Sequence, residues 1–393
     1  MQTHLVTNTG RLLHRTRFSV LAVLTLAGCG GAAAVTSEDV VQRAAVSVNA
    51  QTLDDYVGLF QLPNGALLPI ARDGDRLFAG TMRAELLAQS TRRFTSNGFF
   101  GDLEFERSPD GQVERLNCRL AKRSHWCPRV DPETAIDPTQ MVDAGGMRLR
   151  LLKIGQGSPT IVLEDGFGSG IEAQSSLQAA LAKGACVVSY DHAGTGGSGP
   201  EQGPRDARQI ARELRAALTA ANISPPFVLV GGSIGGDYCR VFAQEYPENT
   251  AGLVLLDPTP DFDALLAWAV VHAPERVESY RRMTSESAKA VQFVMPHQEP
   301  GRRAEWDQLE ATRRQAHAAF PAPHIPVIQI TGAAGREFSP QVDDKVRFFD
   351  VWLREHIPHA EHVLASNGAH AVSITDQPLV VEQVDRLLVR LRK

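Results

Sequence analysis

The sequence predicts an α/β protein with a mostly parallel sheet, preceded by a small antiparallel β-module. From residue 138 onward, short runs rich in β-branched residues alternate with segments whose apolar residues recur every three or four positions. This alternation is typical of parallel sheets with helices on both faces. Between residues 52 and 121 the apolar runs are shorter and are separated by turn-forming residues, which indicates antiparallel strands. The 393 residues, 43% of them hydrophobic, suffice for more than one domain.

The first 28 residues have the composition of an export signal. A basic segment around Arg15 precedes an apolar run, Phe18–Ala27, that is too short to span a bilayer. The run leads into Leu-Ala-Gly-Cys29, which resembles the lipobox of bacterial lipoproteins and implies cleavage before Cys29 and lipidation of that cysteine. We therefore expect a signal peptide over 1–28, a tether over 29–51, and a lipid anchor in a bacterial membrane or envelope. A plain secretory signal is the alternative.

Residues 52–121 are predicted to form the small antiparallel β-module. The turn signals "RDGD" and "PDG" each separate two short alternating runs. The stretches "LDDYVGLFQLPNG", "RDGDRLFAG" and "LEFERSPDGQVERL" resemble the lipocalin-like barrel that is often appended to penicillin-binding-protein-like serine hydrolases. This resemblance implies a substrate-facing or regulatory accessory, and a spacer is the alternative. Prolines from Pro128 onward then indicate a linker over 122–137.

Cys118 and Cys127 are a candidate disulfide pair. They are close in sequence and flank polar residues, and an exported protein meets an oxidising environment. The sequence leaves open whether the bond forms. Cys186 and Cys239 fall on predicted apolar elements and are expected to be buried thiols.

The α/β domain is predicted over residues 138–393. It begins with two strands around Gly145-Gly146. Six further strands are expected at "TIVLEDG", "ACVVSY", "FVLVG", "LVLLD", "VIQITG" and "HVLAS", with helices over 172–183, over 206–221, after "FVLVG" and from Leu379. A mostly helical stretch follows "LVLLD".

The stretch "FVLVGGSIGGDYCRVFAQEYP" joins a strand to a helix through a glycine-rich turn with Ser233 at its centre. After the turn, Tyr238, Phe242 and Tyr246 recur every four residues until Pro247 ends the helix. A sharp turn between strand and helix is the context in which Gly-x-Ser-x-Gly forms a nucleophile elbow. The pattern alone also fits a loop that binds phosphate or nothing, so the serine needs partners elsewhere in the chain.

Candidate partners for Ser233 follow the predicted strands. Functional residues of parallel sheets lie at the carboxyl ends of the strands. In chain order, those ends carry Asp165, Asp191-His192, Ser233, Asp257, Glu337 and His370. A serine, an acid and a histidine in this order match the chain order of the triad in α/β hydrolases.

The chain from Met141 to its C-terminus resembles α/β-hydrolase-fold esterases. The resemblance rests on "MVDAGGMRLRLLKIGQGSPTIVLEDGFGSG", "VVSYDHAGTGGSGP", the serine stretch, "AGLVLLDPTP" and "NGAHAVSITDQPLVVEQV". It implies an α/β-hydrolase fold with a helical cap at about 258–323, whose apolar residues should set the substrate. It also implies Ser233 as nucleophile, His370 as base, and an oxyanion hole made by the backbone N–H groups of Ile234 and Phe167. Gly232 departs from the family, where most members carry histidine, and this leaves the shape of the pocket open.

The acid of the triad is open between two loops. The usual family position follows "VIQITG", where only Glu337, or Asp343 and Asp344 further on, carry a carboxylate. Asp257 ends the preceding strand, at a second site from which some members supply the acid. We predict Asp257, with Glu337 as the main alternative.

The remaining histidines favour no metal site. His356, His359 and His362 have the spacing of metal ligands, but Pro358 breaks the helix that would align them. His192 lies in a turn where the family often has a basic residue for structural reasons.

The sequence thus predicts a lipid-anchored serine hydrolase that cleaves small acyl esters through an acyl-enzyme and uses no cofactor or metal. The net charge of −5 argues against a nucleic-acid partner. The alternative is a catalytically retired hydrolase fold that acts as a surface-anchored binding protein.

Overall fold

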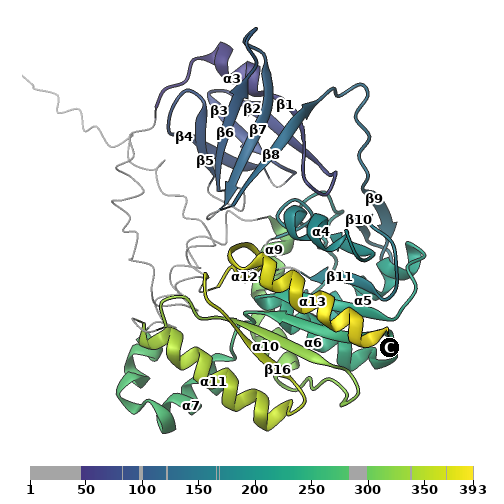
Figure 1. The fold of residues 1–393 in the computed structure, drawn as a ribbon, viewed down its shortest axis with the longest axis vertical. Helices are drawn as coiled ribbons and strands as arrows, with labels where there is room; N and C mark the ends of the chain where they lie inside the picture. Colours follow the sequence, from purple (N-terminus) through teal and green to yellow (C-terminus); the bar gives the residue numbers. More distant parts are fainter. Residues whose placement is uncertain are drawn as a thin grey trace, which may run out of the picture.

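The computed structural model describes residues 46–392, apart from Met82, 97–100, 121–122, Asp165, Gly168, 283–298, 337–338 and Ala369. It contains a closed β-barrel and, below it in Figure 1, an α/β domain with an eight-stranded sheet. Signal peptide, most of the tether and Cys29 lie outside the described residues. Among the residues that are described, no helix combines the length and apolar character needed to cross a bilayer.

The barrel is antiparallel, and each strand pairs with the next in sequence until the last pairs with the first. Its strands are β1 (Gly58–Gln61), β2 (Leu67–Asp73), β3 (Arg76–Ala79), β4 (Ala84–Ala88), β5 (Arg93–Ser96), β6 (Asp102–Arg107), β7 (Val113–Leu120) and β8 (Arg123–Val130). Alternate side chains point inward, so Phe60, Phe94 and Phe105 fill the interior and are at most 1% exposed. The short helix α3 (Ala50–Tyr56) adds Tyr56, whose ring stacks on Phe105 with centroids 4.0 Å apart.

Both predicted ends of the β-module need correction. At the start, residues 52–56 are helical, because the side chain of Asn49 accepts a hydrogen bond from the N–H of Thr52 and caps α3. At the end, the predicted linker over 122–137 contains strand β8. Pro128 does not end that strand. It lies opposite Arg115 of β7, and the two residues after it, Arg129 and Val130, pair with β1.

The α/β domain has a mixed sheet in the order β16-β15-β14-β13-β11-β12-β10-β9. Its strands are β9 (Gln140–Asp143), β10 (Arg148–Ile154), β11 (Thr160–Glu164), β12 (Val187–Tyr190), β13 (Phe227–Gly232), β14 (Thr250–Leu256), β15 (Val327–Gly332) and β16 (Glu361–Ala365). From β12 to β16 neighbouring strands are parallel, while β10 pairs antiparallel with β12 and β9. The central strands are buried on both faces, as their unbroken apolar runs require.

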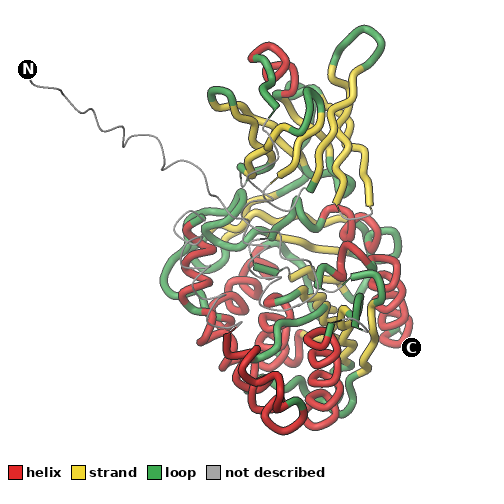
Figure 2. The backbone as a smooth tube through the Cα atoms, turned by 90° about the vertical axis from the view of Figure 1, so that its left-hand side faces the viewer, coloured by secondary structure: helices red, strands yellow, loops and turns green. Residues whose placement is uncertain are grey.

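Helices cover both faces of this sheet (Figure 1). One apolar core joins the sheet to α4 (Ser175–Leu181) and α13 (Gln377–Leu391). On the other face, a larger core joins it to α5 (Ala207–Ala220), α6 (Ile234–Glu245) and α11 (Pro340–His356). Figure 2 shows the barrel directly above the α/β domain. Residues at the carboxyl ends of β11, β13 and β14 line one cavity together with barrel residues, so these strand ends lie next to the barrel.

The stretch predicted as a cap over 258–323 is partly described. It includes α7 (Phe262–His272), α9 (Pro300–Asp307) and α10 (Leu309–His317), while residues 283–298 lie outside the described ranges. α7 packs on α11, and α10 packs on α5 and α6. α9 reaches the strand ends, where the ring of Trp306 packs edge-on against Phe167 with centroids 5.8 Å apart.

The barrel and the α/β domain share apolar and polar contacts. Leu152 and Ile171 of the α/β domain belong to the same buried cluster as the barrel interior. The buried side chain of Asn64, in the loop after β1, donates to Gln178 Oε1 at 2.9 Å and to the carbonyl of Ile171 at 3.3 Å. The barrel is therefore docked onto the α/β domain through buried side chains.

Candidate active site

Ser233 stands on a sharp turn between β13 and α6. Its backbone has φ 54° and ψ −126°, a region that residues with a side chain rarely adopt. The turn is tight because a Cβ at Gly231 would lie 2.5 Å from the carbonyl oxygen of Gly235 and 2.7 Å from Cys239 Sγ. Glycine is therefore required at position 231, and the serine side chain is held out at the carboxyl end of the sheet.

Ser233, His370 and Asp257 form a continuous hydrogen-bonded path. His370 Nε2 lies 3.1 Å from Ser233 Oγ, and His370 Nδ1 lies 2.6 Å from Asp257 Oδ2. The three residues follow β13, β16 and β14, so the parallel sheet brings them together from positions up to 137 residues apart. Ser233 Oγ also lies 3.3 Å from Thr259 Oγ1. The arrangement places a base within reach of a hydroxyl and a carboxylate behind the base.

Asp257 is buried and has two hydrogen-bond donors besides His370. The ammonium of Lys345, on α11, lies 2.8 Å and 3.0 Å from its two carboxylate oxygens, and the N–H of Gly332 donates to Oδ1 at 2.8 Å. Burial alone would raise the pKa of Asp257, but the Lys345 charge and the contact with His370 lower it below its usual value. The carboxylate thus stays ionised next to the imidazole.

The other acid candidates lie elsewhere or are not described. Asp344 is buried and binds the Arg276 guanidinium, with Tyr280 donating at 2.8 Å. Asp343 accepts from Arg336 at 2.6 Å. Glu337 lies outside the described residues.

Ile234 and Phe167 both flank the serine. Ile234 is the first residue of α6, where backbone N–H groups have no acceptor within the helix. Phe167 is 6% exposed, and a Cβ at its neighbour Gly166 would lie 3.2 Å from Ser233 Cβ. The loop that carries Phe167 therefore runs directly against the turn that carries Ser233.

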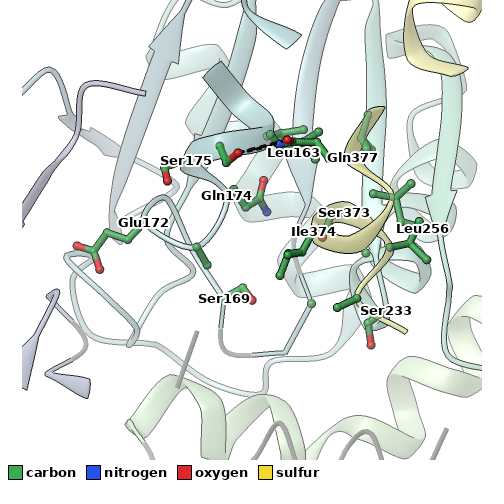
Figure 3. Close-up of a pocket in the computed structure, with 18 of the residues that line it drawn as sticks. Leu163, Ser169, Glu172, Gln174, Ser175, Ser233, Leu256, Ser373, Ile374 and Gln377 are labelled. Carbon is green, nitrogen blue, oxygen red and sulfur yellow. Dashed lines mark hydrogen bonds between the residues drawn. The ribbon is translucent and has the colours of Figure 1, made fainter. Parts of the chain in front are cut away.

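A cavity of about 220 Å³ opens beside Ser233 and His370. Figure 3 shows Ser233 and Glu172 on opposite sides of its lining, with Ser169 and Gln174 between them. Its lining is mostly apolar and includes residues of the barrel as well as of the α/β domain. Polar side chains also line it, among them Ser169, Gln174 and Gln377. A concave, largely apolar site with polar groups at defined positions is the usual form of a small-molecule pocket.

A buried charged cluster lies behind the site. His192 Nε2 lies 2.7 Å from Glu164, at the end of β11, and Nδ1 lies 2.8 Å from Glu305 of α9. Burial alone would lower the pKa of His192, but the two carboxylates raise it to about 10, so the ring is protonated at neutral pH. His192 therefore links α9 to the sheet and takes no part in the path to Ser233.

The histidines with metal-like spacing have separate partners. His356, His359 and His362 bond to the carbonyl of Trp352, the carbonyl of Ile325 and Thr331 Oγ1, respectively. Within the described ranges, no group of three or more His, Cys, Asp or Glu side chains is placed to hold a metal ion.

Cys118 and Cys127 are free thiols on neighbouring strands β7 and β8. Their Sγ atoms are 3.7 Å apart, and both side chains line the cavity near Ser233. The hydrogen bond with Cys127 and burial raise the pKa of the Cys118 thiol, which keeps it protonated.

Lys345 and the barrel residues of the cavity are the parts of the site that the sequence analysis missed. Lys345 had a detectable signal: it lies between Val342 and Val346 and four residues before Phe349, on the apolar stripe of α11. A lysine in such a stripe needs a buried carboxylate as partner. The barrel residues had no comparable signal, because their approach to Ser233 depends on how two domains dock.

The comparisons with known proteins agree with this architecture. The family model described as alpha/beta hydrolase fold matches residues 159–292. A protein of Azorhizobium caulinodans named "Putative carbamate hydrolase RutD" is 36% identical over 112 residues, which are 28% of this chain and 42% of that relative. Its namesake from Klebsiella pneumoniae is 29% identical over 245 residues, 56% of this chain and 87% of the relative.

The chain spans about two fifths of the length of the curated relatives with 36% identity. Among solved structures, a thermophilic esterase from Thermogutta terrifontis superposes with a TM-score of 0.45 at 17% identity, covering 65% of this chain and 99% of that one. Family model, strand order and the position of the serine turn together identify the domain that follows the barrel as an alpha/beta hydrolase fold.

Proposed function

We propose that this protein is a serine hydrolase that cleaves esters through an acyl-enzyme, with Ser233 as nucleophile, His370 as base and Asp257 as the acid. The observation that carries the proposal is the hydrogen-bonded path from Ser233 Oγ through His370 to Asp257, set on a strained turn at the carboxyl end of the sheet. The relatives named as carbamate hydrolases support hydrolysis of an acyl group as the reaction class.

The geometry suggests an ordinary two-step mechanism. His370 Nε2 takes the proton of Ser233 as Oγ attacks the substrate carbonyl, and Asp257 stabilises the imidazolium that forms. The N–H groups of Ile234 and Phe167 receive the negative charge of the tetrahedral intermediate. The intermediate collapses as His370 returns its proton to the leaving alcohol. Water then attacks the acyl-enzyme by the same route and releases the acid and Ser233.

Labelling with a fluorophosphonate probe, together with turnover of short p-nitrophenyl esters, tests the proposal. Ser233→Ala should abolish both and leave the thermal midpoint nearly unchanged, whereas Ser169→Ala, a second serine of the cavity lining, should still be labelled. A chain that is folded but never labelled at Ser233 would be the retired binding protein instead.

Asp257→Asn tests the choice of acid. By analogy with triads changed in this way, turnover should fall by roughly 10⁴-fold, because the amide favours the wrong imidazole tautomer. Glu337→Gln and Asp343→Asn should cost far less. The reverse ranking, with all variants folded, would move the acid to the later loop.

We also propose that the protein is exported and held to a bacterial membrane by lipid on Cys29, with the barrel as a lipocalin-like accessory. The lipobox-like sequence before Cys29 supports the anchor, and the eight consecutive antiparallel strands of the closed barrel support the lipocalin resemblance. Cys29→Ser should release the protein from the membrane fraction. Retention of that variant after a high-salt wash would contradict lipidation at this residue.

A further inference from the structure

The cavity beside Ser233 has walls from two domains. On the α/β side it is lined by Leu163, Val230 and Leu256 of the central strands, with Leu177 and Val372 from the helices above them. On the other side the wall comes from the barrel. Its residues are Leu62 and Pro63 after β1, Cys118 of β7, and His125 and Cys127 of β8.

The barrel wall is fixed in position. The barrel interior and Ile171 of the α/β domain share one buried cluster, and Asn64, next to Pro63, is hydrogen-bonded to Gln178 and Ile171. A second link joins Thr81, after β3, whose N–H and hydroxyl donate to Glu172 at 3.2 Å and 3.0 Å. The side chains that the barrel presents to the cavity therefore have a defined distance from Ser233.

The chemistry of the lining suits an uncharged apolar chain. Its two carboxylates are already engaged, Glu164 by Tyr190 and His192, and Glu172 by Thr81 and Arg150. The described lining residues include no lysine or arginine that could bind an anionic group. An apolar cavity of about 150 Å³ accommodates benzene, so 220 Å³ has room for a chain of roughly eight or nine carbons.

We propose that this cavity holds the acyl chain of the substrate and that the barrel sets the length of chain that the enzyme accepts. The inference rests on the proposed ester hydrolysis at Ser233 and extends it. The acyl group is the part of the substrate that becomes bonded to Ser233 Oγ, and Val230, on the strand that carries the serine, lines the cavity. The preferred substrates are thus esters of medium-chain fatty acids.

The test is the chain-length profile of kcat/KM on p-nitrophenyl esters from acetate to dodecanoate. For the wild type, kcat/KM should rise by up to about fourfold per added methylene, the value of burying one CH₂ group. It should then fall once the chain outgrows the cavity, past roughly eight or nine carbons.

Two barrel variants should shift this profile in opposite directions. His125→Trp fills the wall and should move the optimum to shorter chains, with a loss of at least about tenfold on octanoate relative to acetate. Leu62→Ala enlarges the cavity and should move the optimum to longer chains. The matched control is Trp126→Ala on the same strand, because Trp126 is 47% exposed and packs against Arg115 on the outer face of the barrel.

The outcomes separate the two proposals. If the wild type hydrolyses esters through Ser233 but folded His125→Trp and Leu62→Ala keep its profile, the barrel does not set the acyl length and the inference fails alone. A shift confined to acetate esters of lengthening alcohols would place the leaving group in the cavity and overturn the acyl assignment. If no ester is hydrolysed through Ser233, both proposals fail. Should His125→Trp not fold, Leu62→Ala decides.

Discussion

Asp257 is the residue on which most of the site depends. It is buried, and it accepts hydrogen bonds from His370 after β16, from Lys345 on α11 and from the N–H of Gly332 at the end of β15. Because the carboxylate carries the only negative charge of the path to Ser233, the lysine both stabilises its buried charge and competes with His370 for it. Lys345 is thus a positioning residue.

Lys345→Met should destabilise the fold and shift the pH dependence of turnover. Removing one partner of a buried ion pair costs about 3–5 kcal/mol. Without the lysine charge, the pKa of Asp257 should rise. As the pH is lowered, the rate of the variant should therefore begin to fall at a higher pH than the rate of the wild type. Thermal unfolding and the pH–rate profile measure the two effects.

Two variants control for the lysine experiment. Lys345→Arg should restore part of both properties, because it keeps the charge. Arg354→Met removes a cation from the same helix, where its pair with Asp350 is exposed, and should cost at most about 1 kcal/mol. An unchanged pH–rate profile in Lys345→Met would show that the lysine does not act on Asp257 and His370.

Glu172 should make stability depend on pH. Its burial, together with the nearby Asp191 carboxylate, raises its pKa from 4.5 to about 7. Between these values the folded state binds more protons than the unfolded state, so the free energy of unfolding decreases as the pH rises. A shift of this size corresponds to about 3 kcal/mol, lost by pH 8.

Glu172→Gln removes this dependence while keeping an acceptor for Thr81. The thermal midpoint of the variant minus that of the wild type should increase steadily from pH 4.5 to pH 8. Any effect of the amide that does not depend on pH adds the same amount to this difference at every pH. A difference in midpoint that is the same at both pH values would mean that Glu172 titrates normally.

At the residue scale, the sequence predicted a site residue where its structural context comes from neighbouring residues in the chain. Ser233 could be placed because the glycines around it, the strand before it and the helix after it are contiguous in sequence. The choice between Asp257 and the later carboxylates was open, because it depends on which strand end lies nearest His370. Lys345 follows from the same long-range packing of α11 against the sheet.

At the scale of elements, the turn that carries Ser233 shows why a glycine pattern predicts structure. Gly231 has the carbonyl of Gly235 and the sulfur of Cys239 where a side chain would begin. The aromatic residues that recur every four positions after Ser233 predicted a helix, and the apolar run before Ser233 predicted a strand. The structure has these elements as α6 and β13. The last strand of the barrel was harder to predict from the sequence, because Pro128 indicated a linker. In the structure, pairing with the distant strand β1 keeps this part of the chain extended.

Gly231→Ala should therefore destabilise the protein and reduce turnover. The new methyl group cannot be placed without moving the backbone of α6, and overpacking of this kind costs about 1–3 kcal/mol. The control is Gly184→Ala, whose Cβ would meet only a side-chain oxygen at 4.0 Å. Thermal midpoints of the two variants should differ clearly. Equal midpoints would mean that the turn is less tightly packed than these distances imply.

At the scale of the whole molecule, the arrangement of the two domains matters more than either fold. Alternation of strands and helices predicted the α/β domain, and short alternating runs predicted a β-module before it. Closure of the barrel and its position against Ser233 could not be predicted, because both depend on contacts between residues more than 60 positions apart, such as Phe60 with Arg129 and Asn64 with Gln178. The contribution of the barrel to the site is therefore a property of tertiary structure.

The buried contacts of Asn64 should make the barrel and the α/β domain unfold together. Domains joined by a small polar interface usually move and melt separately, whereas a shared apolar core couples them. Asn64→Ala leaves the carbonyl of Ile171 without this donor, which costs about 1–3 kcal/mol, and loosens the docking of the barrel. In calorimetry the wild type should give one transition and Asn64→Ala two.

Asn117→Ala is the matched control, since Asn117 is also a buried barrel asparagine but its hydroxyl partner, Ser124, belongs to the barrel itself. This variant should lower the midpoint while keeping a single transition, because it weakens the barrel without touching its contacts to the α/β domain. If both variants gave the same single transition, the coupling would reside in the apolar cluster around Ile171 and not in the hydrogen bonds of Asn64. Ile171→Ala should then be the change that separates the two transitions.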